Sequence, residues 1–321
     1  MSQDNYTEVK NLLSFVIPCY RSENTIESVY QEIRQVVAER PDYSYEIIAV
    51  NDCSPDGVLS VLRHLASEDS SFRVVSLSRN FGKHSAIMAG LSFVRGELVV
   101  CLDDDLQCPV PELWRMVDAV RNENFDCATA AYHKKQEVFW KRIGSRFNSA
   151  MVSLLINPPD GVQVENFFVA KRFVCDEILR YRNPYPYVTG LLMQATHRIC
   201  MIPMEQRARG DEKNTGFTLK KSLSLFLNGM TSFSVKPLRL ASFLGIMFAF
   251  LGFLYSIIII VRKLVNPSVP LGYSSMMAVS LLSSGIIMLI LGMIGEYLGR
   301  IYISLNNSPQ YVIRETLNIS E

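Results

Sequence analysis

The sequence predicts an α/β domain with a mainly parallel sheet, followed by a C-terminal hairpin of two transmembrane helices. Two observations lead to this prediction. Short apolar segments alternate with helical segments over the first 132 residues, a pattern typical of repeated βα units. Further along, two long runs contain no charged residue, from Leu240 to Val261 and from Leu264 to Gly295.

The expected elements follow in chain order. Strands are expected at 13–18, 45–50, 72–77, 98–102 and 126–132, and helices at 25–39, from Ser54 onward, at 83–94 and at 111–122. Ser54 before Pro55 is typical of an N-cap with proline at the first helical position. In such open sheets, ligands bind just outside the carboxyl ends of the strands.

Three consecutive carboxylates, Asp103, Asp104 and Asp105, follow the apolar run 97–101. Adjacent carboxylates repel one another unless solvent or a cation compensates their charge. A hard divalent cation is usually held by one or two carboxylates together with substrate phosphates. A solvated acidic turn is the alternative, but the position directly after a predicted buried strand favours a cation site.

The two uncharged runs are long enough to cross a membrane. About 20 helical residues cross a hydrocarbon core of roughly 30 Å. We expect spans at about 240–261 and 273–295, because Asn266, Pro267 and Pro270 place the start of the second near Tyr273. Two buried helices of a soluble domain are the alternative. Glycines in these runs suit close helix contacts and permit a homo-oligomer.

The flanking charges and a helical pattern suggest how the chain meets the bilayer. Basic residues precede the first span and follow the second, while the connecting loop holds only Arg262 and Lys263; the positive-inside rule then favours cytoplasmic termini. Apolar residues recur at helical spacing within 218–236, which fits an amphipathic interfacial helix or an ordinary core helix. The expected parts are therefore residues 1–217, the helix 218–236, and 237–321 with both spans and a cytoplasmic C-terminal tail.

Composition excludes several classes of protein. The formal net charge is +1, and no basic tract suggests a nucleic acid partner. The polar segment 1–11 lacks the apolar region of a signal peptide. The seven cysteines form no CxxC pair, so we expect reduced, mostly buried thiols in a cytosolic domain.

Four segments together resemble glycosyltransferase family 2. They are residues 17–23 (IPCYRSE), 50–57 (VNDCSPDG), 78–83 (SRNFGK) and 102–107 (LDDDLQ). Residues 294–302 (IGEYLGRIY) resemble the polyprenyl-phosphate glycosyltransferases, bacterial relatives of dolichyl-phosphate mannose synthase. This resemblance implies a Rossmann-like GT-A fold, a nucleotide sugar with UDP favoured over GDP, and Mg²⁺ or Mn²⁺. It also implies undecaprenyl (polyprenyl) phosphate as the acceptor, held in a lipid bilayer. The implied location is the bacterial inner (cytoplasmic) membrane. The protein would be multi-pass, with the catalytic domain and both termini in the cytoplasm.

The resemblance assigns roles to single residues. The nucleotide sugar would be bound by Pro18, Tyr20, Glu23, Asp52, Asp103, Gln107 and Lys213. The metal would be held by Asp105, as the main ligand, with Asp103 and Gln107, and catalysis would involve Asp103, Asp105, Arg207 and Arg209. The family commonly has Ala where Asp104 stands, so Asp104 is not an expected ligand. Cys108 and Asn51 stand where Asp is usual or frequent.

Two basic segments are candidates for holding phosphate groups. The predicted helix 139–156 carries Lys141, Arg142, Ser145 and Arg146, which would bind the acceptor phosphate or face lipid headgroups. The loop 207–217 resembles the family segment R-x-x-G-x-S-x-Y, which closes over the donor. Either Arg207 or Arg209 could match its arginine.

The expected reaction is transfer of a single sugar onto a lipid phosphate with inversion at the anomeric carbon. A phosphate monoester, with a second pKa of about 6, is largely dianionic at neutral pH, so this acceptor needs no strong base. One alternative is a transferase acting on a lipid-linked or polymeric saccharide; processive synthases carry a QxxRW motif, whereas the only tryptophans here are Trp114 and Trp140. A non-catalytic membrane scaffold is the other.

Overall fold

The computed structural model describes residues 11–132, 164–184, 186–207, 272–305 and 309–319, together with scattered positions between 243 and 265. The chain divides into two compact units. One comprises Met1–Thr218 together with Asn307–Glu321, and the other comprises Leu219–Asn306. The carboxyl-terminal segment therefore belongs to the same unit as the amino-terminal domain.

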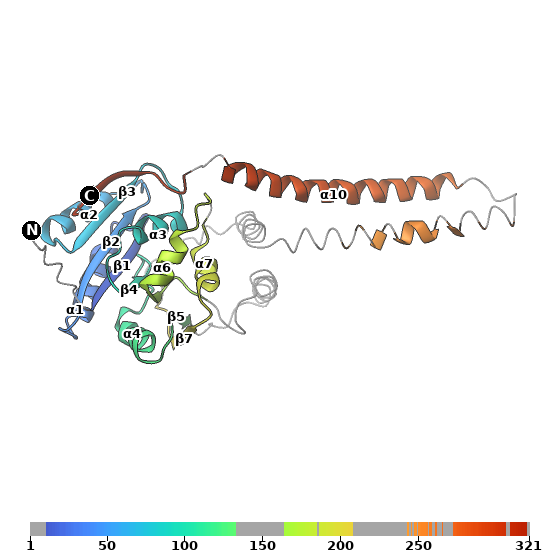
Figure 1. The fold of residues 1–321 in the computed structure, drawn as a ribbon. Helices are drawn as coiled ribbons and strands as arrows, with labels where there is room; N and C mark the ends of the chain where they lie inside the picture. Colours follow the sequence, from blue (N-terminus) through green and yellow to red (C-terminus); the bar gives the residue numbers. More distant parts are fainter. Residues whose placement is uncertain are drawn as a thin grey trace, which may run out of the picture. The chain divides into compact units, whose positions relative to one another are not determined.

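An eight-stranded sheet forms the centre of the first unit (Figure 1). Its strands are β1 (Leu12–Cys19), β2 (Ser44–Asn51), β3 (Phe72–Leu77), β4 (Leu98–Cys101), β5 (Cys127–Tyr132), β6 (Phe168–Lys171), β7 (Ile199–Met204) and β8 (Ile313–Leu317). They lie in the order β7-β5-β6-β4-β1-β2-β3-β8. The pairs β1–β2, β1–β4, β2–β3 and β5–β7 are parallel, while β6 and β8 pair antiparallel with their neighbours. The predicted mainly parallel α/β sheet is confirmed.

Helices cover both faces of this sheet. The helices are α1 (Ile26–Val37), α2 (Val58–Glu68), α3 (Lys83–Leu91), the short 3₁₀ helix η1 (Val110–Glu112), α4 (Leu113–Asn122), α6 (Arg172–Leu179) and α7 (Val188–Ala195). Helices α1, α2 and α4 pack on the face that buries Phe15 and Ile47, whereas α3, α6 and α7 cover the other face. Helix α3 lies very close to the sheet, because a Cβ at Gly90 would meet a methyl of Val16 at 2.5 Å.

One predicted helix start is wrong. Helix α2 begins at Val58, with Gly57 as its N-cap residue, so Ser54 does not cap it. The Ser54 hydroxyl accepts a hydrogen bond from the Arg21 N–H (2.8 Å) and donates one to Asp56 Oδ1 (2.5 Å). The Ser54 side chain therefore joins the loops after β1 and β2 instead of starting a helix.

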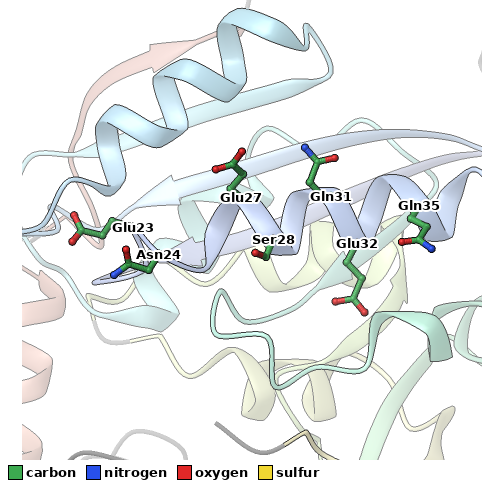
Figure 2. Close-up of a pocket in the computed structure, with 7 residues that line it drawn as sticks. All are labelled: Glu23, Asn24, Glu27, Ser28, Gln31, Glu32 and Gln35. Carbon is green, nitrogen blue, oxygen red and sulfur yellow. The ribbon is translucent and has the colours of Figure 1, made fainter. Parts of the chain in front are cut away.

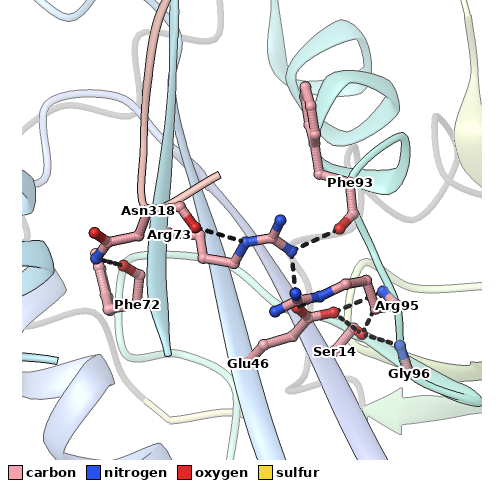
Figure 3. Close-up of polar contacts among 8 residues, drawn as sticks. All are labelled: Ser14, Glu46, Phe72, Arg73, Phe93, Arg95, Gly96 and Asn318. Atoms are coloured by element: carbon pink, nitrogen blue, oxygen red, sulfur yellow. Dashed lines mark hydrogen bonds and ion pairs between the residues drawn. The ribbon is translucent and has the colours of Figure 1, made fainter. Parts of the chain in front are cut away.

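A buried charge network connects the amino ends of the strands (Figure 3). Glu46 of β2 is 2% exposed at its side chain, and its Oε2 contacts Arg73 Nη1 at 2.8 Å and Arg95 Nε at 2.9 Å. Its Oε1 accepts hydrogen bonds from the Ser14 hydroxyl and the Arg95 N–H, both 2.6 Å. Buried charges persist only when paired and hydrogen-bonded. This network stabilises the sheet at the edge opposite the strand carboxyl ends.

The second unit contains the long helix α10 (Tyr273–Leu305), which has 33 residues. It begins at Tyr273, as expected for the second span, and extends past residue 295. Within the described residues, one stretch is long and apolar enough to cross a membrane, Leu282–Gly299. The predicted span 240–261 is described only at scattered helical positions, and the predicted helices 218–236 and 139–156 lie outside the described residues.

Candidate functional site

The acidic loop after β4 spreads its three carboxylates in different directions. Asp104 Oδ2 accepts a hydrogen bond from the Tyr20 N–H (3.0 Å), and its carbonyl accepts one from the Thr25 hydroxyl (2.6 Å). Burial raises the pKa of Asp104. The middle carboxylate thus ties the β4 loop to the β1 loop, which leaves Asp103 and Asp105 as the pair able to face a ligand.

Asp103 meets two polar side chains from distant segments. Its Oδ1 lies 2.5 Å from Lys83 Nζ, and its Oδ2 accepts a hydrogen bond from Asn166 Nδ2 at 3.4 Å. Neither Lys83 nor Asn166 was predicted as a site residue. The available signal for Lys83 was its place in the SRNFGK segment; for Asn166 the sequence offered none, because its approach depends on the pairing of β6 with β4.

Asp105 lies in a turn that follows the end of β4. Asp105 Oδ1 accepts a hydrogen bond from the Gln107 N–H (3.2 Å), and Leu106 between them has φ of 61°. The neighbouring Cys108 is buried, which raises its pKa to about 12. Its thiol is therefore neutral at pH 7 and adds no charge to the acidic loop.

Asp52 shapes the loop that carries Lys83. Its side chain is buried at the end of β2, and its two oxygens accept hydrogen bonds from the N–H groups of Phe81 (2.7 Å) and Gly82 (2.9 Å). Burial raises the pKa of Asp52, although both N–H donors oppose that shift. Gly82 has φ of 90°, a conformation that favours glycine. The next residue, Lys83, begins α3.

Residues of the β1 loop are positioned by the β2 loop. Pro18 pairs with Val50 inside the sheet, whereas Tyr20 is 44% exposed. Glu23 Oε2 accepts a hydrogen bond from the Gly57 N–H at 2.6 Å, and the Glu23 N–H donates to Asp56 Oδ2. In the structure, Tyr20 is thus the exposed aromatic ring at this strand end, and Glu23 holds two loops together.

His84 packs beside the Lys83 corner. Its Nδ1 accepts a hydrogen bond from the Val188 N–H (3.4 Å), and its ring centre lies 5.1 Å from that of Tyr187. Burial and the nearby Lys83 charge lower the pKa of His84 to about 4. The imidazole is therefore neutral at pH 7 and acts as an acceptor toward α7.

Arg207 lies at the edge of the site and faces α1. Its N–H donates to the Gln107 carbonyl (3.2 Å), while its guanidinium binds both oxygens of Glu32 at 2.7 and 2.9 Å. Glu32 lines a polar hollow along α1 (Figure 2) with Glu23, Asn24, Glu27, Ser28, Gln31 and Gln35. Of the predicted donor residues, this hollow includes only Glu23.

The remaining predicted residues lie outside the described part of the chain: Arg209, Lys213, Lys141, Arg142, Ser145 and Arg146. Among the described residues, no group of three or more histidine, cysteine, aspartate or glutamate side chains is arranged to hold a metal ion. Asp103 and Asp105 nevertheless fit a hard cation that takes its other ligands from phosphates and water, since Mg²⁺ often uses only one or two carboxylates.

Comparison with known proteins places these features in a family. Residues 14–179 match glycosyltransferase family 2, and residues 236–301 match the GtrB C-terminal hairpin. The uncharacterized glycosyltransferase YkcC of Bacillus subtilis is 34% identical over 309 residues, covering 95% of this chain and 94% of its own.

Other relatives carry more specific names. An undecaprenyl-phosphate 4-deoxy-4-formamido-L-arabinose transferase of Sodalis glossinidius is 32% identical and covers 94% of this chain and 93% of its own. A prophage-derived bactoprenol glucosyl transferase of Shigella flexneri is 29% identical over 95% of this chain and 98% of its own.

A solved structure supports the fold. The glucosyl-3-phosphoglycerate synthase of Mycobacterium tuberculosis, crystallised with Mn²⁺ and UDP-glucose, has a TM-score of 0.50 at 20% identity, over 69% of this chain and 77% of its own. The sheet, the acidic loop and the C-terminal hairpin identify the chain as a member of glycosyltransferase family 2, a glycosyltransferase with a GT-A-like domain and a GtrB-type hairpin.

Proposed function

We propose that this glycosyltransferase moves one sugar from a UDP-linked donor to undecaprenyl phosphate, or a related polyprenyl phosphate, with inversion. The product would supply a sugar for modifying cell-envelope glycan or lipid. The main support is the pair Asp103 and Asp105 directly outside a buried parallel strand, with Lys83 Nζ 2.5 Å from Asp103. Relatives named for undecaprenyl-phosphate or bactoprenol transfer also align over nearly the whole chain.

The donor would lie along the carboxyl ends of β1, β2 and β4. Tyr20, exposed after β1, offers a ring against which a base can pack. Glu23 and Asp52 both hold neighbouring loops through backbone N–H groups, so they would support the nucleoside pocket through loop position in addition to any direct contact. Asp105, Asp103 and Gln107 would hold Mg²⁺ or Mn²⁺, which neutralises the charge of a leaving diphosphate.

Lys83 is a fixed cation at the reacting end of this site. Its side chain is 38% exposed, so it can contact a phosphate group without leaving Asp103. An acceptor that is already dianionic needs orientation more than deprotonation. This agrees with His84, whose lowered pKa and contact with α7 make it a poor general base.

The strands that share the sheet support a particular membrane topology for the chain. Strands β7 and β8 belong to one sheet, although the hairpin sequence lies between them. If the hairpin enters the bilayer, this membership favours a chain that leaves and returns on the same side, with an even number of crossings. Two spans, with the sheet domain and both termini cytoplasmic, satisfy this condition and the positive-inside rule.

The direct test is a donor screen with the purified full-length chain in detergent. Undecaprenyl phosphate or, in parallel, a lipid-linked saccharide would be mixed with Mg²⁺ and a panel of UDP- and GDP-sugars, and the lipid product would be identified by mass spectrometry. We expect one UDP-sugar to yield a lipid-phosphate-sugar. Transfer only to a lipid-linked saccharide would support the alternative transferase, and no nucleotide release with any donor would support a scaffold.

A further inference from the structure

The carboxyl-terminal segment 309–319 follows the end of α10 and is fastened to the sheet domain along its whole length. At its far end, Asn318 Nδ2 donates to the carbonyls of Ala66 (2.7 Å) and Phe72 (2.8 Å). The Asn318 carbonyl in turn accepts a hydrogen bond from Arg73 Nε, at the buried charge network (Figure 3).

The beginning of the segment is fastened beside the candidate site. Gln310 Nε2 donates to the carbonyls of Tyr181 (2.7 Å) and Asn183 (2.8 Å), so both of its N–H groups are used. Four residues after Asn183, Tyr187 packs against His84, next to Lys83. Gln310 therefore fastens the chain shortly before Tyr187, whose ring contacts His84 beside Lys83.

Val312, two residues after Gln310, contacts the start of the loop 78–83. The Val312 carbonyl accepts a hydrogen bond from the Ser78 N–H at 2.8 Å. Ser78 opens the loop 78–83, whose later N–H groups hold Asp52 and whose last residue pairs with Asp103. The β3–β8 register shifts between Ser76 and Leu77, and such bulges commonly redirect a chain beside a functional site.

We infer that residues 309–312 brace the loop 78–83 of the sheet domain, with Gln310 as a positioning residue for Lys83. The inference rests on the proposed function for the role of Lys83, whereas the bracing itself rests on the contacts above.

Hydrogen exchange of the full-length protein in detergent tests the bracing without any assay of activity. In Gln310→Ala we expect the amides of 78–83, Tyr187 and Val188 to exchange about tenfold faster, with β1 and β2 unchanged. The matched control is Glu315→Gln, which removes an exposed ion pair to Arg63 from the same segment and should leave 78–83 unchanged. Unchanged exchange at 78–83 in Gln310→Ala, or a rise throughout the sheet, would overturn the brace.

Kinetics then test whether Gln310 acts through Lys83. Gln310→Ala should lower kcat about tenfold while the donor KM changes less than about threefold. In a Lys83→Met background the same change should have little further effect, because coupled residues are not additive. Additive losses would overturn the link to Lys83. If the wild-type chain transfers no sugar, the proposed function fails, and the exchange result still decides the brace.

Discussion

At the scale of single residues, the acidic loop separates two kinds of carboxylate. Asp104 is committed to the β1 loop through the Tyr20 N–H, whereas Asp103 contacts Lys83 and Asp105 accepts a hydrogen bond within its own loop. The sequence alone suggested this division only through the resemblance, in which the middle position is commonly Ala. The structure adds a physical reason, because Asp104 is held by backbone groups of the neighbouring strand end.

The first prediction concerns metal dependence. Asp105→Asn should abolish transfer and weaken Mn²⁺ binding, because it removes the main expected metal ligand while keeping the side-chain shape. Asp104→Asn is the matched control, since an amide oxygen can still accept the Tyr20 hydrogen bond, and it should keep Mn²⁺ affinity. Titration calorimetry with Mn²⁺ and turnover with and without EDTA measure both effects. Full turnover in EDTA would remove the metal from the proposal.

The second prediction separates two roles for Arg207. If its guanidinium stabilises diphosphate charge during transfer, Arg207→Ala should lower kcat by about 10²-fold with little change in donor affinity. Glu32→Gln removes the partner that Arg207 contacts in the structure and should leave kcat near the wild-type value, since exposed ion pairs are worth about 0–1 kcal/mol. If Arg207→Ala and Glu32→Gln lower kcat equally, Arg207 acts only through its ion pair with Glu32.

The third prediction follows from the low pKa of His84. In the folded protein the pKa of His84 is lowered to about 4, so the ring stays neutral above that pH. An unfolded histidine takes up a proton below about pH 6.5. The unfolded state binds more protons in this window, so the stability due to His84 is lost as pH falls from 6.5 toward 4. His84→Gln should therefore show a smaller fall in Tm between pH 7 and pH 5. The exposed His64→Gln should keep the wild-type slope.

At the scale of elements, the sequence predicted the first 132 residues closely. The strand predicted at 72–77 matches β3, and the other early elements differ by a few residues at their ends. Periodicity succeeds here because consecutive βα units bury their strands on both faces. The exception is the start of α2, where the turn chemistry of Ser54 was mistaken for a cap.

The later strands were not predicted, for physical reasons. Strand β8 (IRETL) alternates between partly buried and exposed residues and offers little apolar signal. Its partner β3 lies more than two hundred residues earlier in the chain, so only the folded sheet can identify it. Strand β7 contains Pro203. Proline cannot donate a backbone hydrogen bond, so its presence in a sequence argues against a strand, or for one at the edge of a sheet.

The fourth prediction concerns the network between β1, β2 and β3. Glu46→Gln leaves Arg73, 5% exposed at its side chain, without its charge partner, and should cost about 3–5 kcal/mol of unfolding free energy. The exposed pair Arg63–Glu315 is the control, since Glu315→Gln should cost no more than about 1 kcal/mol. Exchange of the slowest sheet amides measures both. If Glu46→Gln lowers the unfolding free energy as little as Glu315→Gln does, other groups compensate the buried charge of Arg73.

At the scale of the whole molecule, the hairpin is an insertion between two strands of one sheet. This arrangement could not be derived from hydropathy, which marks the spans but is silent on where the following segment folds. It supplies a topological argument that is independent of the basic residues at the flanks. The pairing of β8 with β3 and the flanking basic residues both support the proposal that the sheet domain and the C-terminus lie on the same side of the membrane.

The fifth prediction tests that topology directly. Reporter fusions after Glu321 and at the N-terminus should both report cytoplasm, whereas cysteines placed singly in the turn 266–272 should react with an impermeant thiol reagent from outside. Since β8 pairs with β3, a C-terminal fusion outside the cell would require the strand to be absent from the sheet. Deleting residues 273–305 should leave one crossing, which places β8 and β3 on opposite sides of the bilayer. In that variant, the β3 amides that bond to β8 should therefore lose their protection from exchange, while those that bond to β2 keep it. Retained protection at the β8-facing amides would contradict the even number of crossings.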